Sequence, residues 1–290
     1  RVVRKPVQFI DLKLKSSSAQ GISLASKAGP VELTVIAPDL IRLRATRAKS
    51  FTEGSFAVVP HTWPEVKTDV RERKNDIALR TEQFSFQIDK LKGTWRVTDA
   101  NGWTVLCSSN AIEHTKKSGF TLRLGLEAKD QILGLGETTG PLNKRGLIRE
   151  FWNIDVLGHA SCIFPALKNL YVTIPFGLGL REGRAFGVFW DNPGKQVWDM
   201  GCTQNDAWQL TAATGELDVY LFLGGSLPQI NQRYTELTGR MSLPPKWALG
   251  YQQSRYGYPT RKHIEEVAHN FRKKKIPCDV IHFDIMHMDG

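Results

Sequence analysis

Runs of alternating apolar and polar residues fill roughly the first two hundred positions of this 290-residue chain. Residues 31–35 and 41–45 form two such runs, and the turn sequence Ala37-Pro38-Asp39 separates them. A period of two places every second side chain on the same face of a β-strand, so each run predicts a strand with one buried face. The turn between the two runs predicts an antiparallel hairpin.

The same signals recur along this part of the chain. An Asn-Gly pair at 101–102 separates runs at 95–98 and 103–106, which is typical of a tight hairpin. Further alternating runs lie at 84–88, 122–126, 185–190 and 217–223. Many short strands with regular turns predict a sandwich of antiparallel sheets, and we assign residues 1–240 to it.

The pattern changes at the Leu-Pro-Pro sequence at 243–245. The compact apolar run at 247–251 predicts a strand buried on both faces. Thr260 is the expected N-cap of a helix from 261 to about 275, whose apolar residues fall on one face. Residues 280–283 predict a second buried strand.

A strand, a helix and a strand in this order form a βαβ unit with parallel strands and a right-handed crossover. One helix and two strands make an incomplete sheet, so we interpret residues 241–290 as the opening of a larger α/β domain. The predicted fold is therefore mainly β: an N-terminal antiparallel β-sandwich, followed by a first βαβ unit, which the resemblance described below identifies as the start of an incomplete (β/α)8 TIM barrel.

The chain carries a formal net charge of +10. A basic balance can indicate a nucleic acid, an anionic surface or an acidic substrate as partner. Lys and Arg are scattered through the predicted strands, and the densest run, at 273–275, closes the predicted helix, where cations suit the helix dipole. We therefore interpret the charge as a solvated surface and expect no nucleic-acid partner.

No apolar run approaches the roughly 18 residues of a membrane helix, so we expect no membrane partner. The four cysteines are far apart and include no C-x-x-C pair. They are too sparse for a disulfide scaffold, and we expect buried free thiols, with a single bridge left open. The sequence does not indicate a compartment.

Candidate binding residues follow the two strands of the predicted βαβ unit, because ligands sit at the carboxyl ends of parallel strands. Tyr256 lies in the loop after the first strand, and Asp284 ends the second. An aromatic ring offers a face to the apolar side of a sugar, and a carboxylate accepts hydrogen bonds from vicinal hydroxyls. The alternative, that Tyr256 packs and Asp284 caps the next helix, fits the spacing equally well.

A third segment lies in the predicted sandwich and contains the sequence Gly-Leu-Gly-Glu at 134–137. It is not a dinucleotide motif, because the third glycine, Gly140, falls one place late and no helix follows. The later group at 152–155 is either an Asx turn with a packed Trp152 or a loop reaching over a sugar pocket.

His282, Asp284 and His287 are close in sequence, but two such groups on one strand face without a third at ligand spacing are usually structural. The sequence therefore predicts no metal and no cofactor. No Ser-His-Asp or Cys-His pattern for nucleophilic catalysis is visible.

These segments, in this order, resemble the α-glucosidases of glycoside hydrolase family 31. The resemblance rests on the groups at 134–138, 144–146 and 152–155, and continues through 171–176 and 187–192. Residues 243–252 resemble the entry to the family's catalytic barrel, and 276–285 resemble its second strand. The resemblance covers roughly residues 134–290, and several unrelated motifs agree in order and spacing.

The resemblance implies a galactose-mutarotase-like β-sandwich in front of a (β/α)8 barrel. It implies a retaining hydrolase that releases α-glucose from the non-reducing ends of α-glucosides or oligosaccharides. Retention needs two carboxyl groups about 5 Å apart, and in the family both come from later barrel strands. We therefore expect no catalytic residue in this chain, and expect the remainder of the barrel, in the same or a second chain, as its partner.

Four residues match substrate-pocket positions of the family. Asp284 matches the carboxylate that holds glucose hydroxyls, and Ile285 its apolar neighbour. Tyr256 matches an aromatic residue of the same subsite, and Asp155 a sandwich-loop carboxylate that closes the pocket. Two weaker matches in the same segments are Trp152 and Arg255.

The chain departs from the family at 286–287, where Met-His replaces the Asp-Tyr of many members. This leaves the linkage and the leaving group open, and keeps α-xylosidase and transglucosidase activity as alternatives within the family. Outside enzymes, a non-catalytic carbohydrate-binding or structural module is the main alternative. A nucleic-acid-binding protein rests on net charge alone.

Overall fold

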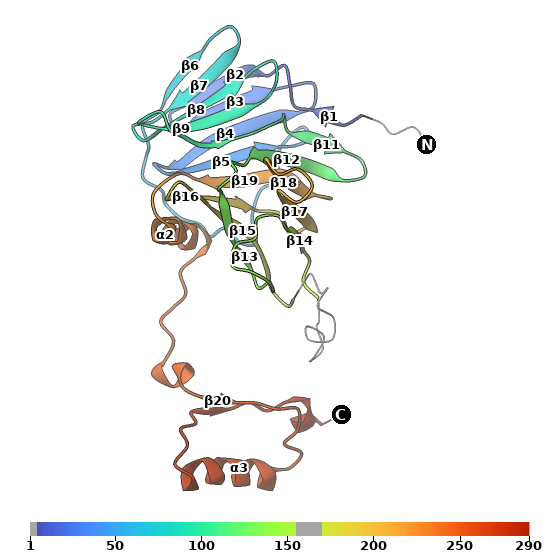
Figure 1. The fold of residues 1–290 in the computed structure, drawn as a ribbon, viewed down its shortest axis with the longest axis vertical. Helices are drawn as coiled ribbons and strands as arrows, with labels where there is room; N and C mark the ends of the chain where they lie inside the picture. Colours follow the sequence, from blue (N-terminus) through green and yellow to red (C-terminus); the bar gives the residue numbers. More distant parts are fainter. Residues whose placement is uncertain (1–4, 155–169, 290) are drawn as a thin grey trace. The chain divides into compact units, whose positions relative to one another are not determined.

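The computed structural model describes residues 5–154 and 170–289. The chain divides into two compact units, Arg1–Gly239 and Arg240–Gly290, each described here by itself (Figure 1). The first unit is built from antiparallel sheets, as predicted. None of the helices in the described part of the chain is both long and apolar enough to cross a bilayer.

The described residues of the first unit form three sheets. In the eight-stranded sheet the order is β13-β15-β16-β19-β5-β4-β3-β2. Its strands are β2 (Lys13–Ser18), β3 (Gly21–Ala25), β4 (Pro30–Ala37), β5 (Leu40–Ala45), β13 (Gln131–Gly136), β15 (Thr173–Arg181), β16 (Arg184–Trp190) and β19 (Leu217–Phe222).

The other two sheets have the orders β1-β11-β12-β18-β17-β14 and β10-β9-β8-β7-β6. The strands of the first are β1 (Val7–Gln8), β11 (Glu113–Thr115), β12 (Gly119–Gly125), β14 (Ile148–Phe151), β17 (Gln196–Met200) and β18 (Ala207–Ala212). Those of the second are β6 (Asp69–Glu72), β7 (Asp76–Arg80), β8 (Phe84–Asp89), β9 (Trp95–Asp99) and β10 (Thr104–Cys107).

Burial alternates along the strands with the same period of two as the apolar residues in the sequence. In β4, the alternate residues Val31, Leu33 and Val35 are all buried, and their neighbours are half-buried. β4 pairs antiparallel with β5, with Val35 opposite Ile41, so the predicted hairpin is confirmed. The predicted β9–β10 hairpin is also antiparallel.

The main core lies between the sheets and is rich in tryptophan. Trp190, Trp198 and Trp208 are fully buried, and the rings of Trp198 and Trp208 meet edge to face at 5.6 Å. Gly177 of β15 makes room for them, because a Cβ there would lie 2.6 Å from the Trp208 ring. The close-packed interior therefore requires glycine at this position.

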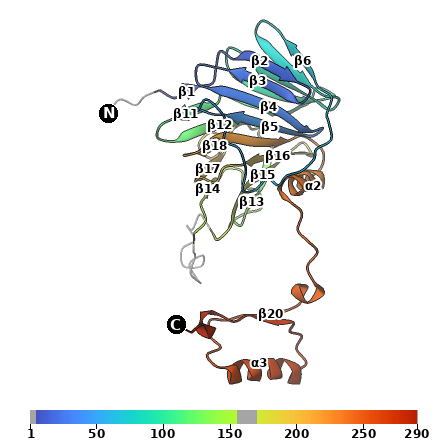
Figure 2. The ribbon, with the colours of Figure 1, turned by 180° about the vertical axis from the view of Figure 1, so that it is seen from behind.

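The outer face of the eight-stranded sheet has its own apolar layer, covered by helix α2 (Leu227–Thr238). The helix lies beside β16 in both ribbon views (Figures 1 and 2). Tyr234 of α2 stacks on Phe176 of β15 with ring centroids 3.8 Å apart. The segment at 57–63 packs against the same layer, and Val59 N donates to Leu237 O at 3.0 Å.

The Gly-Leu-Gly sequence at 134–136 is an irregularity in β13. All three residues have positive φ, and the pairing with β15 shifts register between Gly134 and Gly136. A left-handed conformation is strained for Leu135, at a cost of about 1–3 kcal/mol. Its side chain is buried in the main core, which offsets this cost.

The second unit contains a strand, a helix and a strand in the predicted order, although the first strand does not lie at the predicted residues. These are β20 (Gln252–Gln253), α3 (Arg261–Lys273) and β21 (Val280–Ile281), flanked by the 3₁₀ turns η1 (Lys246–Leu249) and η2 (Ile285–His287). β20 and β21 pair in parallel, as predicted. The prediction of a buried strand at 280–283 is wrong in its burial, because β21 is half-buried and Phe283 is exposed. Thr260 caps the helix, because its Oγ1 accepts from His263 N at 3.2 Å.

The prediction of a buried strand at 247–251 is wrong. The segment makes the turn η1, and Trp247 and Leu249 are 57% and 72% exposed. Pro245 precedes the turn with a φ of −63°, a geometry suited to starting a helical turn. A five-residue apolar run is too short for its periodicity to separate a strand from a turn.

The expectation of buried cysteines is also only partly met. Cys107, Cys202 and Cys278 are free thiols, of which only Cys278 is buried, and Cys162 lies outside the described residues. Cys202 is exposed because it sits in the surface turn after β17, where its N–H donates to Asp199 Oδ1 at 2.7 Å.

Candidate functional site

Asp284 and Tyr256 follow the carboxyl ends of the two parallel strands in the second unit. Because Gln253 lies opposite Ile281, the loops that contain Tyr256 and Asp284 leave from the same edge of the sheet. Tyr256 is 68% exposed, so the packing alternative for this residue is not what the structure has. The aromatic residue of this loop that packs is Tyr258, which is buried and receives a hydrogen bond from Gln253 Nε2 at 3.1 Å.

Asp284 is the N-cap of η2. Its Oδ1 accepts from Ile285 N at 2.6 Å, so the capping alternative is observed. The bond uses one carboxylate oxygen and fixes the rotation of the group, while the other oxygen keeps its acceptor capacity. Ile285 is exposed, and the two residues therefore present a carboxylate beside an apolar side chain.

Asp155 lies outside the described residues. Its neighbours Trp152 and Asn153 are described, at the end of β14. Phe151 is buried and packs on Trp198 at 4.8 Å, so strand alternation turns Trp152 outward, where it is 50% exposed. Asn153 Oδ1 accepts from Thr173 N and Oγ1 at 2.8 and 2.7 Å, a contact with β15 and not an Asx turn.

Trp152 and Asn153 line a hollow of about 360 Å³ on the first unit, together with Phe56 and Asp191. A second hollow of about 430 Å³ adjoins it, because the two share Phe56 and the residues at 191–193. We call the pair the strap hollow, and we call residues 50–58, which line it on one side, the strap. The sequence analysis did not find this feature.

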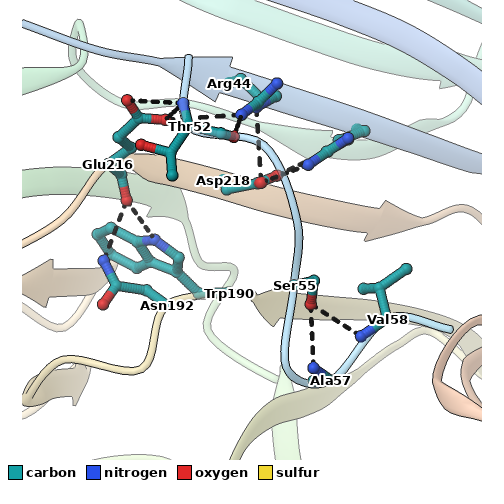
Figure 3. Close-up of polar contacts among 10 residues, drawn as sticks. Arg44, Thr52, Ser55, Ala57, Val58, Trp190, Asn192, Glu216 and Asp218 are labelled. Carbon is teal, nitrogen blue, oxygen red and sulfur yellow. Dashed lines mark hydrogen bonds and ion pairs between the residues drawn. The ribbon is translucent and has the colours of Figure 1, made fainter. Parts of the chain in front are cut away.

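The start of the strap is held by a charged side chain of β5 and by Glu216, the residue before β19. Arg44 Nη2 donates to Thr52 O at 2.6 Å, and Thr52 N donates to Glu216 Oε2 at 3.1 Å (Figure 3). Arg44 also lies 3.5 Å from the carboxylate of Asp218, which Arg42 grips through two hydrogen bonds of 2.6 and 2.8 Å. The backbone of Thr52 is thus fixed on both sides.

The middle of the strap is held by Ser55. Its Oγ accepts from Ala57 N at 3.0 Å and Val58 N at 2.8 Å (Figure 3). In both bonds Ser55 Oγ is the acceptor, so the hydroxyl proton remains available to another acceptor. Burial raises the pKa of Asp191 above its ordinary value, although the Ser55 hydrogen bond opposes the shift.

The floor of the strap hollow is internally satisfied. Asn192 Nδ2 donates to Thr214 O at 2.8 Å. Asn192 Nδ2 and Trp190 Nε1 both donate to Glu216 O, at 3.1 and 3.2 Å (Figure 3). The Gln196 amide group bonds to Trp198 and to the backbone of 190 and 192. These side chains hold the loop after β16, at 191–195, against the loop before β19, at 214–216.

One sequence signal lay close to this feature. Asp191 and Asn192 directly follow the predicted strand at 185–190, where an apolar run ends in two polar residues. The strap itself has no regular pattern, and only the fold brings it beside Asp191. Within the described residues, no three His, Cys, Asp or Glu side chains come together as metal ligands.

Residues 30–199 match the family profile described as the glycosyl hydrolase 31 N-terminal galactose mutarotase-like domain. Residues 241–290 match the profile of the glycosyl hydrolases family 31 TIM-barrel domain.

Similar proteins include several glycosidases. Alpha-glucosidase 2 of Bacillus thermoamyloliquefaciens is 34% identical over 264 residues, which are 90% of this chain and 33% of the relative. An alpha-xylosidase of Saccharolobus solfataricus is 26% identical over 88% of this chain and 34% of its own length. The chain thus spans about a third of these curated relatives.

Among solved structures, a GH31 dextranase of Flavobacterium johnsoniae in complex with isomaltotriose superposes with a TM-score of 0.84. It is 27% identical, and the match covers 98% of this chain and 34% of the dextranase.

Proposed function

This chain belongs to glycoside hydrolase family 31, and we propose on that basis that the protein is a retaining α-glucosidase that releases glucose from the non-reducing ends of α-glucosides. The observation that carries the proposal is the 34% identity to an α-glucosidase over 90% of the chain. An α-glucoside or oligosaccharide is the proposed substrate.

Retention of configuration proceeds in two steps, each using two carboxyl groups. One carboxylate attacks the anomeric carbon while the other carboxylic acid protonates the departing oxygen, which gives a covalent glycosyl-enzyme. Water then breaks this bond, with the second group acting as base. We place both groups in later barrel strands, so this chain contributes binding residues and no catalytic residue.

In this proposal, Asp284 holds glucose hydroxyls. The capping bond from Ile285 N orients the carboxylate before substrate arrives, which reduces the entropy lost on binding. Ile285 gives the apolar side of the sugar a surface to contact. The exposed ring of Tyr256, on the loop beside it, offers a stacking face.

A second specificity has support within the same family. The dextranase with a TM-score of 0.84 was solved with isomaltotriose, an α-1,6-linked glucose trimer. Met286 and His287 stand where many relatives have Asp and Tyr, so the region that meets the leaving group differs. Relative rates on maltose, isomaltose and an α-xyloside decide between these substrates.

The test is the Asp284→Ala variant of the full-length protein, with Asp289→Ala as the matched control. Asp289 is an exposed acid five positions along the same segment. Loss of two charge-assisted hydrogen bonds, at about 1.5–3 kcal/mol each, lowers kcat/KM by at least about a hundredfold. Equal values of kcat/KM in the two variants would contradict the assignment of Asp284 to the substrate pocket.

We also propose that the sandwich domain spans residues 1–240 and that the barrel begins at 241. The division into two compact units at Gly239 and the start of the second family match at 241 support this boundary. Limited proteolysis checks it: the first cut falls at 239–245, and a first cut inside the sandwich sheets contradicts it.

A further inference from the structure

We propose that the strap hollow is a binding site for a neutral oligosaccharide, formed entirely by residues of the first unit. Phe56 and Trp152 supply the ring faces, Asp191 a hydrogen-bond acceptor and Asn153 a donor. The ligand class rests in part on the proposed function, because a glycosidase encounters oligosaccharides. The site itself rests on the chemistry of its lining.

The two aromatic rings are exposed on segments that the fold holds in place. Phe56 is 98% exposed, although Ser55 and Ala57 on either side of it are held by the Ser55 hydrogen bond. Burying a Phe side chain stabilises a protein by about 1.5–3 kcal/mol, and the fold does not use this ring for that purpose. Trp152 is half exposed on a strand end whose next residue, Asn153, is bonded to β15.

Some polar groups of the hollow already have hydrogen-bond partners within the protein, and others keep capacity for a ligand. On the floor, Asn192 and Gln196 spend their hydrogen bonds on the protein itself. Asp191 lines both parts of the hollow and forms no ion pair in the described part of the chain, so its two carboxylate oxygens retain acceptor capacity. Asn153 Oδ1 bonds to Thr173, and this contact leaves its Nδ2 hydrogens free to donate among the described residues.

An acceptor, a donor and two ring faces in one hollow match a sugar ring, which has vicinal hydroxyls around an apolar face. The charges of the lining argue against an anion. Three residues of the lining are acidic: Glu53, Glu216 and Asp218. The side chain of Arg44 is only 7% exposed, and it already donates to the strap at Thr52 O. A phosphate or a nucleic acid therefore finds no exposed cation in the described lining of the hollow.

The experiment is isothermal titration of the 290-residue chain with isomaltotriose and with maltotriose, in an Asp284→Ala background. This background removes the candidate pocket of the second unit. The expected result is millimolar binding that weakens at least tenfold in Phe56→Ala and in Asp191→Asn. Leu142→Ala is the control: it removes an exposed apolar side chain outside the hollow and leaves binding unchanged.

Near-UV circular dichroism of the core tryptophans confirms that each variant is folded. Absence of sugar binding in the Asp284→Ala chain overturns the proposal, as does equal binding by the Phe56→Ala, Asp191→Asn and control variants. Binding of inorganic phosphate in place of sugar also overturns it.

The two proposals fail separately. If the full-length Asp284→Ala enzyme keeps its activity while Phe56→Ala loses sugar binding, the pocket of the second unit is wrong and the strap hollow stands. If Asp284→Ala abolishes the activity of the full-length enzyme while Phe56→Ala leaves sugar binding unchanged, the strap hollow is wrong and the pocket of the second unit stands.

Discussion

The buried ion pair between Arg181 and Asp130 gives the most quantitative prediction for the first unit. Arg181 Nη2 and Nε donate to the Asp130 carboxylate at 2.5 and 2.9 Å, and Nη2 also donates to Gly125 O at 3.0 Å. The side chains are 6% and 1% exposed. The pair ties β15 to the turn before β13, at the edge of the eight-stranded sheet.

Replacing Asp130 by Ala leaves a guanidinium that is nearly inaccessible to water without its counter-charge. Breaking one side of a buried pair costs about 3–5 kcal/mol, because the remaining charge stays desolvated. Replacing both partners with apolar residues costs much less, since no buried charge remains. Asp130→Leu with Arg181→Met is therefore expected to recover most of the loss.

The assay is urea unfolding followed by circular dichroism at 25 °C. The surface pair Arg71–Asp69 is the matched control, because its side chains are 59% and 54% exposed. Asp69→Ala is expected to cost less than about 1 kcal/mol. A cost below about 1 kcal/mol for Asp130→Ala, or a double variant less stable than the single one, would refute the reasoning.

Three further predictions concern single positions. Gly177→Ala places a methyl group 2.6 Å from the Trp208 ring, and overpacking of about 1–3 kcal/mol should lower the thermal midpoint; an unchanged midpoint contradicts the packing. Asp191 has a raised pKa in the folded state, so its contribution to stability is present at low pH and lost as pH rises through the folded pKa. Asp191→Asn should therefore raise the thermal midpoint at pH 7 more than at pH 3, and the opposite order contradicts this sign. Thr260→Ala removes the cap of α3 and should cost about 1 kcal/mol, seen as faster amide exchange in the first helical turn, whereas unchanged exchange excludes the cap.

The sheet structure was predictable because apolar residues, which become buried, alternate with polar residues along the strands. Residues 31–35 and 95–106 show this pattern, and each forms the expected antiparallel pairing. The helix at 261–273 was predictable for the same reason, with a cap at Thr260 and apolar residues on one face. In the strands local preference and tertiary burial agree, whereas the helix has no fully buried residue and follows its local signals.

The errors come from segments where periodicity is absent or too short. The run at 247–251 contains only apolar residues and glycine, and it forms a turn after two prolines instead of a buried strand. Cys202 lies in a turn, where residue type alone did not indicate its exposure.

For the candidate sites too, the sequence indicated some residues and gave no signal for others. Asp284 and Tyr256 were predicted because they follow strands of a recognisable βαβ unit, and Ile285 was predicted from the family resemblance; all three stay predictions. The strap hollow was not found, because Phe56 and Asp191 are far apart in sequence and meet only through the long-range pairing of β5 with β19 and of β19 with β16. A loop without periodicity has no sequence signal for such a meeting.

The measurement that tests the central claim most directly is the anomeric form of the sugar first released by the full-length protein. Proton NMR of the hydrolysis of p-nitrophenyl α-glucoside, in which the only glucose comes from the non-reducing unit, separates the α and β anomers before mutarotation mixes them. The α-glucosidase proposal predicts α-glucose first, from the non-reducing end, because two displacements restore the configuration. Release of β-glucose first, or no release from maltose, isomaltose or an α-xyloside, would contradict it.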